Sequence, residues 1–227
     1  MSIRIEKNYR SILAQIAAAC ERVGRDPAEV RLVVVSKTVG FKEIAAAIDA
    51  GVHDFGENRT NLFKEKHDTY PNEHWHFIGS IQTNKIKDIV GRAALIHSVA
   101  SERALTAIAK RAQFLGITQD LLIEVNVSGE ESKDGIAPDL LGRLLDLATG
   151  LEGIKVRGLM TMAPQGDEQR IRAAFRGLRE LRDSCVVSNE AFERVQLREL
   201  SMGMSDDFSL AVEEGATIVR IGRSIWL

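Results

Sequence analysis

A lysine that follows an apolar run near the start of the chain could supply an amine for covalent chemistry. The run is Leu32–Val35, and Lys37 comes two residues after it. Apolar walls around an amine disfavour its charged form and lower its pKa, and a neutral amine is a nucleophile toward aldehydes. The alternative is a lysine that reaches solvent or pairs with Glu57 or Glu124, which is the more common case for a lone lysine at a strand end.

A second group of residues, near the C-terminus, could bind a phosphate. Ser205 precedes an expected short helix at 206–215, where free backbone N–H groups point outward. Gly222 allows the backbone to approach a ligand closely, and Arg223 could add its charge or only its N–H. In the alternative reading Ser205 caps the helix. The two aspartates that follow Ser205 argue mildly against a phosphate unless they point outward.

An arginine interrupts the apolar segment TIVRIG and adds a third element of chemistry. By strand alternation Arg220 and Gly222 share one face of this segment. An inward arginine needs an acceptor, either a carboxylate or a heterocyclic nitrogen. A lysine amine, a phosphate cup and an arginine between them suit pyridoxal 5′-phosphate (PLP). Its aldehyde would form a Schiff base with Lys37, and its pyridine nitrogen would face Arg220.

The elements that must position these residues are eight short β-rich runs that alternate with helix-like segments. This alternation favours parallel strands joined by right-handed crossovers. No G-x-G-x-x-G follows the first run, which argues against an open doubly wound sheet. We therefore expect an α/β fold, a single (β/α)8 TIM-type barrel, with its site at the carboxyl ends of the strands. The expected strands are 31–38, 52–58, 74–80, 95–101, 121–128, 156–163, 197–205 and 217–226.

We expect one PLP-binding barrel domain over residues 1–227, with an extra N-terminal helix at 1–24 and the barrel at 31–227. The first twenty residues place Ile5, Ile12, Ile16 and Ala19 on one helical face. They lack the small-residue cleavage site of a signal peptide. Since this helix precedes the first strand, it is an addition to the barrel.

Composition and charge exclude several classes of function. The net charge of −2 leaves no basic footprint for nucleic acid, and no apolar run approaches the ~20 residues of a membrane span. The two cysteines are too few for a disulfide framework or a zinc site, and they fit a reducing cytoplasm. His74 and His76 alternate on one strand face without a third ligand, so we expect no metal and place them beside Trp75 at a strand start.

Six motifs, in this order and spacing, closely resemble the pyridoxal phosphate homeostasis protein family (YggS/PROSC type) over essentially the whole chain. They are VVVSKT, HDFGEN, WHFIGSIQTNK, GLMTMAP, LSMGMSDDF and VRIG. The resemblance implies a single barrel similar to the N-terminal domain of alanine racemase, with Lys37 as the Schiff-base lysine. It also implies a role in balancing intracellular vitamin B6 and amino-acid pools, without an established reaction.

The resemblance further implies the residues that would bind the cofactor. Arg220 would face the pyridine nitrogen, and the phosphate would be held by Ser205, Gly222 and the backbone of Arg223. Asn58 and Ser201 would line the pocket. The family usually continues past the last strand with Phe-Gly and a short tail, whereas this sequence ends at Leu227. This leaves the contribution of the tail open but affects none of the phosphate residues.

The alternative function is a PLP-dependent amino-acid racemase or a related enzyme acting at the α-carbon. An arginine does not give its proton to the ring nitrogen, so the cofactor is a weaker electron sink and a second base is needed. By the resemblance, alanine racemase takes that base from a tyrosine of a second domain. Here the tyrosines are Tyr9, in the N-terminal helix, and Tyr70, expected at the opposite barrel end. We therefore expect a monomeric carrier or sensor rather than an enzyme, with PLP-dependent apoenzymes as candidate partners.

Overall fold

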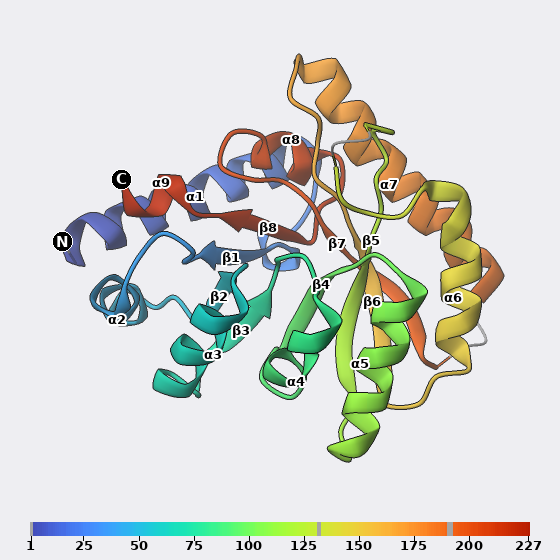
Figure 1. Ribbon diagram of the computed structural model, residues 1–227. Coiled ribbons are helices and arrows are strands. Elements are labelled where there is room, and N and C mark those ends of the chain that lie inside the picture. Colours follow the sequence, from blue (N-terminus) through green and yellow to red (C-terminus); the bar gives the residue numbers. More distant parts are fainter. Residues whose placement is uncertain (1, 131–132, 190–192) are drawn as a thin grey trace.

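Eight parallel strands close into a barrel in which neighbours in the sequence are neighbours in space (Figure 1). The computed structural model describes residues 2–130, 133–189 and 193–227. The (β/α)8 expectation is confirmed. The strands are β1 (Arg31–Val35), β2 (Asp54–Glu57), β3 (His74–Phe77), β4 (Leu95–Val99), β5 (Gln119–Glu124), β6 (Ile154–Met160), β7 (Val195–Ser201) and β8 (Ile218–Ile221).

The helices form the outer ring, and local sequence signals set their ends. Ser101 caps α5 by accepting a hydrogen bond from the N–H of Ala104. Gly51 has a φ of +87°, a left-handed conformation that suits a glycine following the C-cap Ala50 of α2. The helices are α1 (Ser2–Arg22), α2 (Phe41–Asp49), α3 (Thr60–Thr69), α4 (Ile86–Ile89), α5 (Glu102–Phe114), α6 (Leu141–Thr149), α7 (Glu168–Asn189), α8 (Phe208–Glu213) and α9 (Arg223–Trp226).

All eight strands end earlier than the sequence predicts, and two of these differences are large enough to affect the site. β5 ends at Glu124 instead of Ser128, because the Asn126 carboxamide accepts hydrogen bonds from the Ser128 hydroxyl and the Gly129 N–H and turns the chain. The last expected strand is divided into β8 and the short helix α9. The Trp226 indole in α9 donates to the Val35 carbonyl, 2.7 Å away, at the end of β1.

The added helix α1 lies beside α8 and α9 and covers the outside of the barrel there (Figure 1). Its buried residues include the four expected from the pattern, Ile5, Ile12, Ile16 and Ala19. The Asn8 carboxamide donates to the carbonyl of Ile225, 3.1 Å away. Helix α1 therefore joins the two ends of the chain, and Met1 lies outside the described residues.

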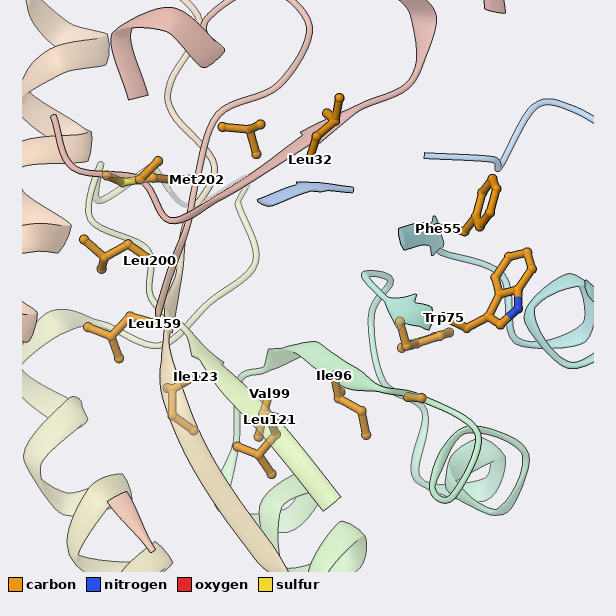
Figure 2. Packing of buried hydrophobic residues seen from close by; sticks show 14 of the residues in the cluster. Leu32, Phe55, Trp75, Ile96, Val99, Leu121, Ile123, Leu159, Leu200 and Met202 are labelled. Atoms are coloured by element: carbon orange, nitrogen blue, oxygen red, sulfur yellow. The ribbon is translucent and has the colours of Figure 1, made fainter. Parts of the chain in front are cut away.

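Alternate residues along each strand pack into two separate apolar groups. Outward residues fill the space between strands and helices, where Phe55 stacks on Trp75 with ring centroids 5.2 Å apart (Figure 2). Inward residues form a smaller cluster in the barrel interior, made by Val33, Leu95, Leu122, Met160 and Ile218. In the described part of the chain no helix is long and apolar enough to cross a membrane.

Candidate functional site

A pocket of about 500 Å³ opens at the carboxyl ends of the strands, the end where barrels carry their sites. Residues that lie far apart in the sequence meet there, because the parallel strands all end on the same side. Six of the seven predicted site residues line it. They are Lys37, Asn58, Ser205, Arg220, Gly222 and Arg223.

Lys37 follows β1, and a buried ion pair fixes the strand end that carries it. The Lys66 ammonium lies 2.6 Å from Glu57 Oε2 and donates to the Ser36 carbonyl, 2.7 Å away. The other oxygen of Glu57 accepts the backbone N–H of Asn58 at 2.9 Å. Glu57 is therefore already paired with Lys66, which removes one of the two carboxylates that Lys37 could have paired with.

The Lys37 side chain is not enclosed by apolar walls, and this differs from the sequence expectation. β1 ends at Val35, and Lys37 is exposed at the pocket mouth. A second cavity of about 500 Å³, bounded partly by α1 and α9, also touches Lys37. The amine is thus accessible from two sides, and no ion pair of Lys37 is present among the described residues.

Ser205 lines the pocket beside Gly222 and Arg223 and does not cap α8. Helix α8 begins at Phe208 with Asp207 as its N-cap, so the expected helix start at residue 206 and the Ser205 cap are both wrong. Asp207 instead accepts the N–H of Met204 at 2.6 Å. The neighbouring Asp206 binds the Arg223 guanidinium through both oxygens, at 2.7 and 2.6 Å, which offsets its charge beside the pocket.

The close approach of β1 explains why position 222 is a glycine. A Cβ at this position would lie 3.1 Å from the Val35 carbonyl oxygen and 3.3 Å from the Val35 Cβ. The chain therefore passes close to β1 on one side and leaves its backbone open to the pocket on the other.

Arg220 forms the pocket floor on the inner face of β8. Its side chain donates from Nη1 to the Ser201 hydroxyl at 2.6 Å and from Nη2 to the Thr161 carbonyl at 3.1 Å. Burial lowers the pKa of Arg220 to about 10, while the charges of Glu124 and Asp207 act in the opposite direction. The guanidinium is therefore charged at neutral pH. Since it has five N–H donors, others remain for a ligand in the pocket.

Ser201 is the predicted residue that the structure does not place in the pocket wall. It is completely buried beneath Arg220, and its hydroxyl lies 2.8 Å from His97 Nδ1. His74 and His76 flank Trp75 at the start of β3, as predicted. His76 is buried in the barrel interior, 2.9 Å from His97, whereas His74 is exposed. No group of three or more metal-ligating side chains occurs among the described residues.

Glu124 lines the pocket, and the sequence reasoning named it only as a partner for Lys37. It is buried, and its pKa is raised to about 7, first by burial and then by the nearby charge of Asp134, while Arg220 opposes the shift. Because the sequence pattern predicts that this strand ends at Ser128, it does not identify Glu124 as a residue at the strand end. The alternation of inward Leu122 with Glu124 is the signal that could have found it.

The chain matches the family "Alanine racemase, N-terminal domain" over residues 8–227. A pyridoxal phosphate homeostasis protein of Aquifex aeolicus is 44% identical over 93% of this chain and 92% of that protein. The chain belongs to the pyridoxal phosphate homeostasis protein family. The resemblance in the sequence motifs is thereby confirmed.

Solved structures agree with this family assignment. PipY of Synechococcus elongatus PCC7942, with PLP bound, is 32% identical with a TM-score of 0.80, and the match covers 93% of this chain and 100% of that one. An alanine racemase of Clostridium difficile 630 has a TM-score of 0.75 at 16% identity. That match covers 97% of this chain but 56% of the racemase, and it shows the shared fold alone.

Proposed function

We propose that this chain binds PLP as a Schiff base on Lys37 and serves intracellular PLP homeostasis by holding and releasing the cofactor. The names of its relatives and the PLP-bound structure of PipY support the cofactor. We further propose that the chain acts as a single-domain monomer in the cytoplasm and exchanges PLP with PLP-dependent apoenzymes.

The observation that carries this proposal is one pocket that brings three kinds of group together. An exposed lysine amine lies at its mouth, and a charged guanidinium lies at its floor. The hydroxyl of Ser205, the open backbone of Gly222 and the N–H of Arg223 lie at the remaining side. This donor set fits an aldehyde, a heterocyclic nitrogen and a phosphate on one small molecule.

Each group has a separate task toward the cofactor. When bound, PLP supplies an aldehyde that links reversibly to an amine. Arg220 would donate a hydrogen bond to the ring nitrogen and keep its own proton, since the guanidinium is too weak an acid to give it up. Ser205, Gly222 and Arg223 would hold the phosphate, and Asn58 would contact the ligand from the end of β2. Ser201 would act indirectly, through its contact with Arg220.

The surroundings of Lys37 favour storage and release over racemisation. Neither tyrosine of the chain lines the pocket: Tyr9 lies in α1, and Tyr70 caps the C-terminus of α3. The exposure of Lys37 and the second cavity beside it leave room for an incoming amine or an acceptor protein. These features suit reversible exchange of the cofactor.

The direct test of the proposal is Lys37→Ala, with Lys42→Ala on α2 as the matched control. We expect Lys37→Ala to lose the visible absorbance of the bound cofactor and the adduct that borohydride fixes, because Lys37 is the only lysine among the described residues that lines the pocket. Lys42 is exposed and does not line the pocket, so its variant should behave as the wild type. A reducible adduct that persists in Lys37→Ala and maps to another lysine would refute the assignment.

A second candidate function is a reaction at the α-carbon of an amino acid, and Glu124 is the observation that favours it. Its carboxyl changes protonation near neutral pH inside the pocket, as an acid–base group must. An enzyme of this type should exchange the α-proton of some amino acid in deuterated water, and Glu124→Gln should abolish the exchange. A carrier should instead pass PLP to an apoenzyme faster than free dissociation allows.

A further inference from the structure

Three buried side chains and the half-buried Asp54 join the pocket floor to the opposite end of the barrel. From Arg220 the contacts run to Ser201 at 2.6 Å, to His97 at 2.8 Å, to His76 at 2.9 Å and to Asp54 at 3.0 Å. The His97–Ser201 contact crosses the interior between β4 and β7, two strands that are not neighbours. Such interiors are usually filled by branched apolar side chains.

The ionised carboxylate of Asp54 and two neutral rings together fix the direction of the hydrogen bonds between them. An ionised carboxylate only accepts, so His76 donates from Nε2 to Asp54 and, as a neutral ring, accepts at Nδ1. His97 therefore donates from Nε2 to Nδ1 of His76 and accepts at its own Nδ1, so the Ser201 hydroxyl donates to His97. The Ser201 oxygen accepts from Arg220 through a lone pair.

The charges around Asp54 keep its carboxyl in the accepting form. Burial alone would raise the pKa of Asp54, but the hydrogen bond from His76 and the charges of Arg31 and His74 bring it below its ordinary value. Arg31 Nε lies 4.0 Å and His74 Nδ1 3.6 Å from the carboxylate.

Burial has the opposite effect on the two rings. It lowers the pKa of His76, although Asp54 opposes the shift. It lowers the pKa of His97 well below its ordinary value, with the charges of Arg220 and Arg31 acting in the same direction. Both rings are therefore neutral, and each carries its proton on Nε2.

We propose that Asp54, His76, His97 and Ser201 are positioning residues: they form a one-directional hydrogen-bond relay that fixes the Arg220 guanidinium at the pocket floor. The relay gives Arg220 an acceptor whose proton is directed away from it, so the guanidinium is held in a single orientation. Through the same contacts, a change at Asp54 on the far side of the barrel alters the pocket. Its effect on the cofactor rests on the proposed function, whereas the relay itself is a property of the chain alone.

The first test needs no cofactor. The chain has five histidines, so the variants His53→Gln, His67→Gln and His74→Gln, combined, leave only the two relay rings for nitrogen NMR. In the ligand-free protein at pH 7 we expect both rings to be neutral and protonated on Nε2. A proton on Nδ1 of either ring, alone or in a charged imidazolium, would overturn the relay, whether or not the chain binds PLP.

The second test measures the effect on the pocket with Asp54→Ala. Outer partners of this kind commonly alter ligand affinity about tenfold when removed, so we expect a rise of about tenfold in the dissociation constant of PLP and a changed visible spectrum. His67→Ala is the matched control, because His67 lies on α3 and contacts Asp68, outside the relay. Circular dichroism shows whether Asp54→Ala has folded. If it has not, the NMR measurement alone tests the relay.

A mutant cycle separates an effect through Arg220 from a general loss of structure. In an Arg220→Lys background the relay has no guanidinium to orient, so Asp54→Ala should no longer change PLP affinity. Equal effects of Asp54→Ala with and without Arg220 would refute the positioning role. Absence of PLP binding by the wild type would refute the proposed function instead and leave the relay to the NMR result.

Discussion

Glu124 is the pocket residue whose charge changes near neutral pH. Its pKa is raised from 4.5 to about 7 by burial and by Asp134. A carboxyl with a raised pKa binds its proton more tightly in the folded state. Its stabilising contribution is therefore present below the unfolded value and is lost as the pH rises from 4.5 through about 7.

We expect Glu124→Gln to be more stable than the wild type above pH 7, because glutamine cannot ionise. The shift corresponds to a difference of about 3 kcal/mol at most, and it should shrink toward pH 4.5. Urea unfolding of the ligand-free protein at pH 5 and pH 8 measures it. Glu152→Gln, at an exposed position, is the control. The same pH dependence in Glu124→Gln and in the wild type would contradict the expectation.

At the residue scale, the sequence predicts which functional side chains lie near strand ends better than it predicts side-chain contacts across the barrel interior. Lys37 and Arg220 are found because a charged residue in an apolar run is unusual, and both line the pocket. The contact between His97 and Ser201 joins positions 104 residues apart, and no spacing announces it. Burial of His76 likewise depends on where the barrel closes, which a single strand does not reveal.

At the scale of elements, the Glu57–Lys66 pair joins the ends of β1 and β2 and the helix α3. We expect Lys66→Met to destabilise the protein by about 3–5 kcal/mol, because it leaves a buried carboxylate without its partner. Lys66 is 2% and Glu57 0% exposed. Lys66→Met should also weaken PLP binding, since both flanking loops carry pocket residues.

The control for this prediction is the double variant Glu57→Gln with Lys66→Met. It removes the charge but keeps an oxygen that can accept the N–H of Asn58, so it should be more stable than Lys66→Met alone. Urea midpoints compare the three proteins. An unchanged midpoint in Lys66→Met would show that the pair contributes nothing to holding the strand ends.

The alternation of strand-like and helix-like segments predicts which strands and helices form, but it does not always predict where they end. Eight strands are expected and observed, and the Ser101 hydroxyl caps α5. The early end of β5 depends on the two hydrogen bonds that the Asn126 carboxamide accepts within its own turn. The position of α9 involves a hydrogen bond from Trp226 to the distant Val35, and local propensity carries no information about such a partner.

At the scale of the whole molecule, α1 stabilises the barrel by covering it beside α8 and α9. Ile12 is 4% exposed in this contact, whereas the next residue, Leu13, is 40% exposed. We expect Ile12→Ala to cost about 2–4 kcal/mol of unfolding free energy, from lost burial and the cavity left behind. Leu13→Ala should change it by less than about 0.5 kcal/mol. Urea denaturation measures the unfolding free energy of both variants. Equal losses of unfolding free energy would contradict the expectation that the buried face of α1 carries its packing.

The hydrogen bond from Trp226 to the Val35 carbonyl also gives the molecule an intrinsic optical probe. The chain contains two tryptophans. Trp226 donates its hydrogen bond to Val35, the residue two positions before Lys37. Trp75 instead stacks on Phe55 in the packing layer outside the barrel. Fluorescence from Trp226 therefore originates beside Lys37, which lines the same cavity. With Trp75 replaced by phenylalanine, the emission of one indole would follow events at Lys37 in real time without any added label.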